Sequence, residues 1–362
     1  MNGGRGPDGV ERRVDVAGRL IGSRQPCFVI AEAGVNHNGD TRFAHDLIDV
    51  AADGGADAVK FQTLRPAAMV SAHGTPAPYQ ADAVGAMSQL EMLEQLRLPD
   101  RAWAELAAHA RERGVLFLST AFDVGSADLL DGLGVPAFKV PSGELDNLAF
   151  IADLARRGRP LLISTGMGTM GEVASALATA AAAPGLALFH CVTAYPAPAG
   201  DANLRAIATM RREFGVPVGW SDHTQGHVTA VAAVALGASL LEKHVTLDRS
   251  LPGPDHAASA DPEQFRAYVA AIRETERALG DGAKRPTAAE EENRVHARRS
   301  LHAAIDLEPG HRLSPSDVTV LRPAIGLPPG TDPTGLVVLR AVRAGEPITA
   351  DSVDVEERFL ER

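Results

Sequence analysis

Eight short apolar runs recur along the first 245 residues, and their number and spacing constrain the fold more than any other feature of the sequence. They are "CFVIAE" (27–32), "DAVKFQ" (57–62), "VLFLST" (115–120), "AFKVPS" (137–142), "PLLIST" (160–165), "LALFHC" (186–191), "PVGWSD" (217–222) and "SLLEKHV" (239–245). Apolar runs without alternation are typical of strands buried on both faces, as in a parallel sheet. Helical patterns such as 42–55 and 100–114 separate most of them. Eight strands alternating with helices predict a (β/α)₈ (TIM) barrel.

A doubly wound open sheet is the structural alternative, but no G-x-G-x-x-G motif follows the first run. We expect a disordered lead-in at 1–20, the barrel at 21–280 and a polar linker at 281–297. The remainder, 298–362, reads as a compact, strand-rich domain with Pro/Gly turns. Within it, "LEPGHRLSPSDV" and "VRAGEPITADSV" look like one motif used twice. So small a domain buries little core and gains stability by docking on a neighbouring surface.

Composition narrows the function classes. The net charge is −11, with no basic run and no cluster of stacking aromatics, which argues against nucleic-acid binding. Cys27 and Cys191 lie in apolar runs, so we expect buried free thiols in a reducing cytoplasm. No stretch is apolar enough to span a membrane, and the N-terminal segment lacks the apolar core of a signal peptide. We therefore expect a cytoplasmic protein.

Polar residues stand at the ends of all eight runs, where a (β/α)₈ barrel carries its catalytic groups. Polar loops alone would explain many of these residues. They do not explain charged residues that lie within or directly against apolar sequence, because a buried charge is costly unless it is paired or used. The residues at the run ends are Glu32, Asn36, His37, Lys60, Gln62, Ser119, Thr120, Lys139, Ser142, Glu144, Ser164, Thr165, His190, Tyr195, Ser221, Asp222, His223, Glu242, Lys243 and His244.

The residue types sort into three kinds of chemistry. Lysines with hydroxyls suit a phosphate or carboxylate, and the candidates are Lys60, Lys139, Ser142, Ser164 and Ser221. The carboxylates Glu32, Glu144 and Glu242 are candidate general acids or bases, or salt-bridge partners of the lysines. His223 and His244 end neighbouring runs, so they predict a divalent metal site with open positions, or else two hydrogen-bonded structural histidines.

A long series of motifs resembles the N-acetylneuraminate (sialic acid) synthases and their bacterial nonulosonate relatives. The motifs are "IAEAGVNHNGD", "AVKFQT", "FLSTAFD", "FKVPSGELDN", "ISTGM", "HCVTAYPAP", "GWSDHT", "LEKHVTLDRSLPGPDH" and "ARRSLHAAIDLEPGHRLSPSDVTVLRPAIGLPPG". They run in the family's order from residue 28 to about 330, and the C-terminal part resembles the antifreeze-like (SAF, β-clip) domain of these enzymes. The resemblance implies a transferase that condenses phosphoenolpyruvate with an open-chain N-acylated aminohexose and releases phosphate by C–O cleavage.

The resemblance also implies roles for individual residues. His223 and His244 would hold Mn²⁺ or Mg²⁺, and Lys60, Thr120, Lys139, Ser142, Ser164 and Ser221 would bind phosphoenolpyruvate. Glu144 would handle the attacking water, while Glu32, Glu242 and Lys60 would place reacting groups and move protons. Gln62, Tyr195 and Asp255 would contact the sugar. Arg322 would reach the sugar from the other subunit of a homodimer with exchanged C-terminal domains.

The sugar itself stays open. Residues 63–90 match the family pattern loosely, and Ala194 stands where many members carry an acidic residue, which leaves N-acetylmannosamine and a diacetamido-trideoxyhexose as alternatives. Three other functions use similar residues. They are a Schiff-base aldolase with Lys60 or Lys139 as nucleophile, a metal-dependent sugar isomerase, and a non-catalytic carbohydrate- or ice-binding protein built around the small domain.

Overall fold

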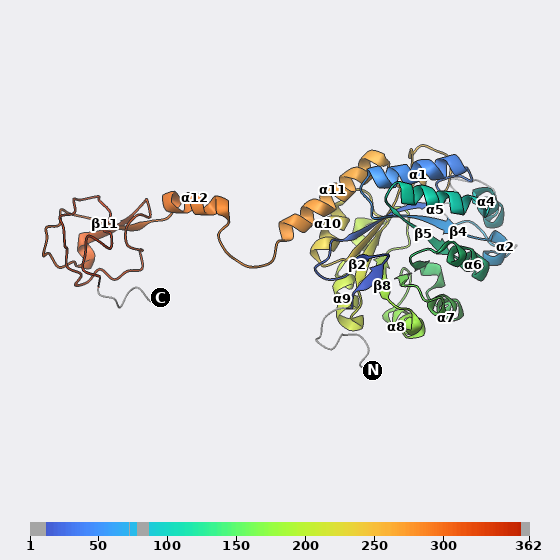
Figure 1. Cartoon of the computed structure of the whole chain (residues 1–362), viewed down its shortest axis with the longest axis horizontal. Helices are drawn as coiled ribbons and strands as arrows, with labels where there is room; N and C mark the ends of the chain where they lie inside the picture. The colour runs from blue at the N-terminus through green and yellow to red at the C-terminus, as the bar shows by residue number, and fades with distance from the viewer. Residues whose placement is uncertain (1–11, 72, 78–86, 356–362) are drawn as a thin grey trace. The chain divides into compact units, whose positions relative to one another are not determined.

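The computed structural model describes residues 12–71, 73–77 and 87–355 of the chain. The chain divides into two compact units, Met1–Gly280 and Asp281–Arg362. Figure 1 shows the first unit as a ring of helices around a central sheet, and the second as a short helix followed by a mostly irregular chain with two short strands. Each unit is described separately below.

The first unit is a closed barrel of eight parallel strands, which confirms the predicted (β/α)₈ fold over the open sheet. The ring order is β10-β3-β4-β5-β6-β7-β8-β9, so closure occurs between the last strand and the first. Each strand falls within or closely overlaps one of the eight apolar runs. The strands are β3 (Phe28–Gly34), β4 (Ala58–Thr63), β5 (Leu116–Ala121), β6 (Phe138–Val140), β7 (Leu161–Ser164), β8 (Leu186–Cys191), β9 (Val218–Asp222) and β10 (Leu240–His244).

Helices cover the outside of the barrel and pack their apolar stripes on the strands. In α1, Leu47 and Ile48 are fully buried beside Val29 and Phe61 in the main core. Side-chain caps set the starts of several helices, as where Asp40 accepts a hydrogen bond from the Arg42 backbone N–H. The helices are α1 (Thr41–Asp53), α2 (Pro66–Met69), α4 (Gln89–Leu96), α5 (Ala102–Glu112), α6 (Val124–Leu133), α7 (Leu148–Arg156), α8 (Met170–Thr179), α9 (Arg205–Phe214), α10 (Val228–Ala235) and α11 (Pro262–Leu279), with 3₁₀ turns η1 (Ser142–Glu144), η2 (Ala180–Ala182), η3 (Ala199–Asp201) and η4 (His256–Ala258).

A β-hairpin closes the floor of the barrel, at the end where the strands begin. Its strands, β1 (Val14–Val16) and β2 (Arg19–Ile21), pair antiparallel, and Ala17 and Gly18 both adopt positive φ in the two-residue turn. Val14, Val16 and Ile21 are buried in a second core with residues at the starts of several barrel strands. The expected disordered lead-in over 1–20 is therefore wrong for residues 14–20, and residues 1–11 lie outside the described part.

The second unit has its own small core. Its regular elements are α12 (Ala288–Ala297), β11 (Ser300–Ala303), η5 (Pro315–Asp317) and β12 (Val318–Leu321). The two copies of the repeated motif meet at their first residues, where Leu307 and Val342 exchange backbone hydrogen bonds in an antiparallel bridge. Residues 281–297, expected as a polar linker, contain α12, whose ten residues are all outside the core. A capping box between Thr287 and Glu290 starts this helix.

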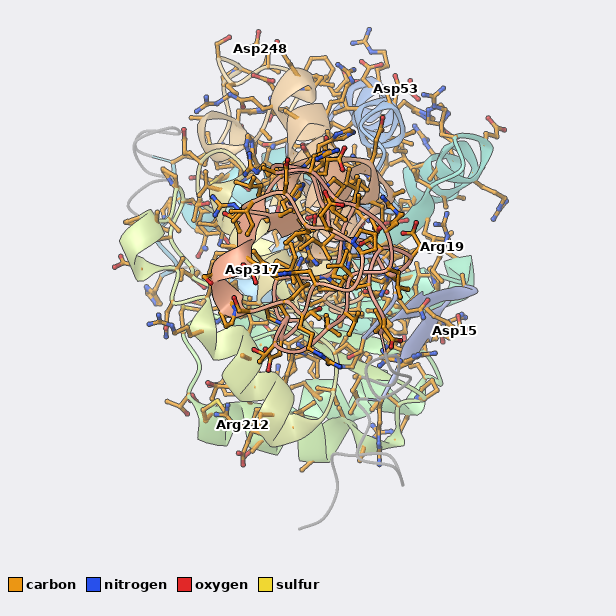
Figure 2. All side chains as sticks on the ribbon, turned by 90° about the vertical axis from the view of Figure 1, so that its left-hand side faces the viewer. Asp15, Arg19, Asp53, Arg212, Asp248 and Asp317 are labelled. Atoms are coloured by element: carbon orange, nitrogen blue, oxygen red, sulfur yellow. The ribbon has the colours of Figure 1, made fainter. Side chains whose placement is uncertain are left out.

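Charged side chains on the barrel surface are solvated or paired locally. Figure 2 shows Asp53 and Asp248 near the edge of the barrel unit. Within the described part of the chain, no helix is both long and apolar enough to cross a membrane.

The floor of the barrel generates a stability prediction. Ile21→Ala should lower the free energy of unfolding of the barrel by about 2–5 kcal/mol, because it leaves a cavity beneath fully buried strands. Leu20 is the matched control, since it lies beside Ile21 but is 44% exposed, and Leu20→Ala should cost less than about 0.5 kcal/mol. Urea unfolding followed by tryptophan fluorescence measures both. Equal losses for the two variants would show that the hairpin does not pack as described.

Candidate active site at the C-terminal end of the barrel

Four buried charges form the centre of the site, two lysines and two glutamates from four different strands. Lys60 Nζ lies 2.5 Å from Glu32 Oε2 and 3.7 Å from Glu242 Oε2. Lys139 Nζ lies 3.1 Å from both carboxylate oxygens of Glu242. All four residues are at most 4% exposed. Each charge therefore has an opposite charge in contact, which is what permits four ionisable groups in a dry interior.

The two glutamates differ in their readiness to hold a proton. Burial raises the pKa of Glu32 to about 7, because loss of water outweighs the attraction of Lys60. Burial also acts on Glu242, but Lys139 and Lys60 together outweigh it and lower its pKa to about 2. Glu242 is thus a permanent carboxylate that holds both lysines, whereas Glu32 can gain or lose a proton near neutral pH.

Hydroxyl groups lie at the same end of the barrel as the lysines, and one of them contacts a lysine directly. Lys60 Nζ donates to Thr120 Oγ1 at 2.9 Å, and Ser221 Oγ donates to Glu242 Oε1 at 3.1 Å. Ser142 begins η1 after β6, and its Oγ accepts from the Gly166 backbone N–H at 3.0 Å. Ser164 is buried at the end of β7. The predicted lysine and hydroxyl residues thus come from the ends of β4, β5, β6, β7 and β9, at one end of the barrel.

Cys191 is a site residue that the sequence analysis did not assign. It is a buried free thiol, as expected, but its Sγ lies 3.2 Å from Ser142 Oγ. Its position as the last residue of β8 was the available signal, since the other candidate residues occupy strand ends as well. Burial raises the pKa of the thiol, so the group is a neutral neighbour of Ser142 rather than a nucleophile.

His223 and His244 face each other across the ends of β9 and β10, with ring centroids 5.6 Å apart. Tyr195 lies against both rings, at 4.2 Å from His223 and 5.6 Å from His244. His223 Nδ1 lies 2.6 Å from the Val192 carbonyl oxygen, so that nitrogen carries the proton and Nε2 is left with a lone pair. His244 Nδ1 is buried without a hydrogen-bond partner.

These two histidines fit a divalent metal. Burial lowers the pKa of His223 to about 4, and burial together with the neighbouring His223 places the pKa of His244 well below its usual range. Both rings are therefore neutral at pH 7, the form that binds metal. In the part of the chain that the structure describes, no three His, Cys, Asp or Glu side chains are placed to hold one ion. The protein would supply two ligands and leave the other positions to substrate and water.

Not all of the residues predicted to contact the sugar lie in the central cluster. Gln62 Nε2 donates to Glu32 Oε1 at 3.2 Å, within the central cluster. Asp255 precedes η4 and is buried, with Oδ1 lacking a partner, and burial raises its pKa to about 6.

Glu144, the residue predicted to handle the attacking water, is half-buried and accepts from Asn147 at 2.7 Å. Among the described residues it therefore contacts its own turn rather than the central cluster. Arg322 lies exposed in the second unit, where its contact with a sugar stays a prediction.

Comparison with known proteins decides the family. The model of the NeuB family matches residues 47–284, and that of the SAF domain matches residues 298–354. The chain belongs to the NeuB family. This confirms the resemblance to sialic and nonulosonic acid synthases that the motifs predicted, and it confirms an antifreeze-like domain at the C-terminal end.

Individual relatives cover most of the chain. An N,N'-diacetyllegionaminic acid synthase of Campylobacter jejuni is 43% identical over 83% of this chain and 91% of its own. One of Legionella pneumophila is 44% identical over 85% and 88%. Among solved structures, the N-acetylneuraminic acid (sialic acid) synthetase of Leptospira borgpetersenii in complex with citrate is 31% identical with a TM-score of 0.69, over 78% of this chain and 95% of that one.

The neutral histidines generate a pH prediction for the metal-free protein. A histidine whose pKa is lower in the folded chain than in the unfolded chain destabilises the fold as the pH falls, because only the unfolded chain takes up the proton. Burial lowers the pKa of His223 from its usual 6.5 to about 4. As the pH falls between these two values, the free energy of unfolding should decrease by about 1.4 kcal/mol per pH unit. His223→Gln should therefore flatten the pH dependence of barrel unfolding by that slope, measured with urea at pH 7, 6 and 5. An unchanged slope would mean that the ring is protonated in the folded protein.

Proposed function

We propose that this NeuB-family chain is a nonulosonic acid synthase that condenses phosphoenolpyruvate with an open-chain N-acylated aminohexose. The observation that carries the proposal is the central cluster: two lysines held at the barrel mouth by glutamates, with two neutral histidines beside them. A substrate with a phosphate and a carboxylate matches the lysines and hydroxyls, and a sugar aldehyde matches a metal site with open positions.

In the proposed reaction, C3 of phosphoenolpyruvate attacks the aldehyde carbon of the sugar, water adds at C2, and phosphate leaves with the bridging oxygen. Lys60 and Lys139 would bind the carboxylate and phosphate, and Glu242 would keep both ammonium groups in place. Glu32 would exchange a proton with the reacting oxygen, since its pKa lies close to neutral pH. Glu144, which ends η1 and contacts Asn147 rather than the central cluster, is the candidate for positioning the attacking water.

A Mn²⁺ or Mg²⁺ ion held by His223 and His244 would polarise the sugar aldehyde. The protein's own contribution is to keep both rings neutral and to orient His223 through the Val192 carbonyl. Tyr195 packs on both rings and would exclude water from that side.

For the acceptor sugar, we favour a diacetamido-trideoxyhexose over N-acetylmannosamine. The support is that two relatives of 43% and 44% identity are both named as N,N'-diacetyllegionaminic acid synthases.

A Schiff-base aldolase is the main rival, and the two lysines differ in how well they suit it. Burial opposes the charge on Lys60, but Glu242 and Glu32 outweigh it and raise the pKa of Lys60, which disfavours a free amine. Burial lowers the pKa of Lys139 despite Glu242, so Lys139 is the better nucleophile of the two. Its two hydrogen bonds to Glu242 nevertheless suit an ammonium group.

The test is incubation with phosphoenolpyruvate, Mn²⁺ and each candidate hexosamine, reading released phosphate and product mass. We expect phosphate release with the diacetamido-trideoxyhexose, loss of activity in excess chelator, and recovery on adding Mn²⁺. Borohydride should not trap a covalent adduct. Full activity in chelator would contradict the metal site. A borohydride-trapped lysine would favour the aldolase, and sugar conversion without phosphoenolpyruvate would favour the isomerase.

The homodimer with exchanged C-terminal domains also remains a proposal, drawn from the family resemblance. It predicts that Arg322→Ala leaves the fold intact and impairs use of the sugar. Mixing this variant with Glu144→Ala should restore part of the activity, because one mixed site would combine an intact barrel with an intact Arg322. A mixture that stays inactive after subunit exchange has been verified would contradict the exchange.

A further inference from the structure

Directly behind the two histidines, on the outer face of the barrel, lies a buried ion pair that the proposed reaction does not use. Asp222 is the last residue of β9, and Lys243 lies opposite it in the register of β10. Lys243 Nζ is 3.5 Å from Asp222 Oδ2, and the two side chains are 4% and 0% exposed. Because side chains alternate along a strand, this outward pair stands between the inward residues Ser221 and His223 on β9, and between Glu242 and His244 on β10.

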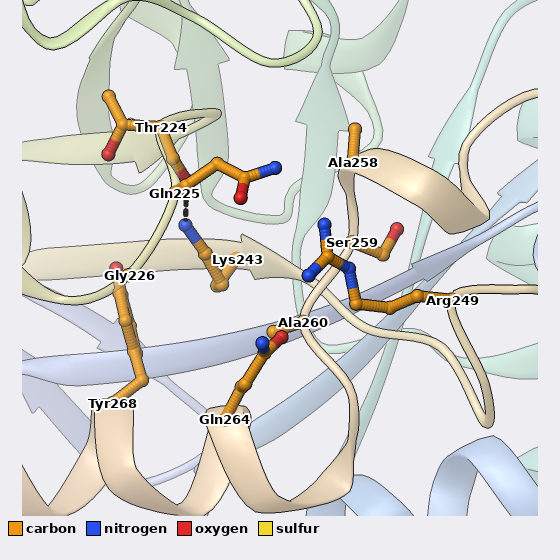
Figure 3. Close-up of a pocket in the computed structure, with 10 residues that line it drawn as sticks. All are labelled: Thr224, Gln225, Gly226, Lys243, Arg249, Ala258, Ser259, Ala260, Gln264 and Tyr268. Atoms are coloured by element: carbon orange, nitrogen blue, oxygen red, sulfur yellow. Dashed lines mark hydrogen bonds between the residues drawn. The ribbon is translucent and has the colours of Figure 1, made fainter.

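The pair also immobilises the backbone that follows His223. Asp222 Oδ1 accepts hydrogen bonds from the Thr224 backbone N–H at 2.9 Å and from Thr224 Oγ1 at 2.7 Å. Lys243 Nζ donates to the carbonyl oxygen of the same Thr224, the contact drawn as a dashed line in Figure 3. The donor and acceptor groups of Thr224 are thus bound to the two members of the pair. His223 is therefore held between two residues whose positions the pair sets.

The outer helices complete this arrangement. Thr229, in α10, donates to Asp222 Oδ2 at 3.2 Å and lies 2.7 Å from Thr224 Oγ1. Tyr268, in α11, places its ring 5.4 Å from Lys243 Nζ. Figure 3 shows Lys243 and Tyr268 on the wall of a small cavity on this side of β10. The cavity measures about 30 Å³, room for about one water molecule.

We propose that the Asp222–Lys243 pair is a positioning device for the metal site: it holds His223 and His244 at the separation and orientation at which both rings can bind one divalent ion. The inference rests on the proposed function, because it assumes that these histidines bind the metal. Asp222 and Lys243 are positioning residues and touch neither substrate nor ion. A partner behind a metal ligand commonly changes metal affinity by about 10–100-fold when it is removed.

The experiment measures Mn²⁺ affinity directly, by the electron paramagnetic resonance signal of free Mn²⁺ over the full-length protein without substrates. Lys243→Met should weaken Mn²⁺ binding by about 10–100-fold. Lys243→Arg keeps the positive charge, and the adjacent cavity can take part of the larger guanidinium group. This variant should therefore bind Mn²⁺ more tightly than Lys243→Met. In activity assays, the Mn²⁺ concentration for half activation should rise for Lys243→Met, with the KM for phosphoenolpyruvate changing less than threefold.

A matched control separates positioning from general stability. Arg273 forms an ion pair with Asp57 at 3.0 Å, at the opposite end of the barrel, so Arg273→Met should lower stability and leave Mn²⁺ affinity unchanged. Thr229→Val is the milder second variant, used if Lys243→Met does not fold, and should weaken Mn²⁺ binding by removing the hydrogen bond to Asp222.

The outcomes are distinct. Unchanged Mn²⁺ affinity in folded Lys243→Met, or in Thr229→Val when Lys243→Met does not fold, overturns the positioning role and leaves the proposed function standing. An equal loss of affinity in Arg273→Met also overturns it, because the effect would then be general. Failure of the unmodified protein to bind Mn²⁺ removes the metal assignment and this inference with it. Weakened binding in the site variants alone supports the inference.

Discussion

The structure of the site depends on balancing four buried charges. Glu32, Lys60, Lys139 and Glu242 come from β3, β4, β6 and β10, and all four are at most 4% exposed. Removing one partner from such a group leaves an uncompensated charge, which typically costs about 3–5 kcal/mol. The cluster is therefore strongly destabilising unless all four strands are in place. The barrel strands, whose other residues are mostly apolar and buried, hold the four charged side chains in fixed positions.

The four charges can be balanced only when the barrel is closed. Glu242 and Glu32 lie on the last and first strands, which become neighbours only when β10 pairs with β3. Lys139 lies on β6, which is not adjacent to β10 in the ring, and its contact with Glu242 crosses the barrel interior. A ring of apolar strands thus brings together charges that lie 210 residues apart in the chain, from Glu32 to Glu242. The site cannot form before the fold is nearly complete.

Much of this could be predicted from the sequence, because its two strongest signals are local. Unbroken apolar runs located all eight barrel strands, and polar residues at their ends located the site. Contacts between distant strands could not be predicted, since Lys139 could have faced either glutamate until the barrel geometry was known. Lys243 and Asp222 were recognised as strand-end residues, but which face they occupy depends on the register. The hairpin at 14–21 was missed because its strands have three residues each and lie beside a polar segment.

That hairpin has a consequence for how the barrel could be isolated. The family match begins at residue 47, after the first barrel strand and the whole hairpin. A fragment cut at that boundary would lose β3, and one cut just before β3 would still leave Phe28, Leu162 and Leu240 without their cover. These apolar residues at the starts of the strands would then be exposed to water, at the end of the barrel opposite the charged cluster. A fragment that keeps the barrel intact must therefore start upstream of Val14, whereas the family boundary at residue 47 would cut the chain inside the barrel.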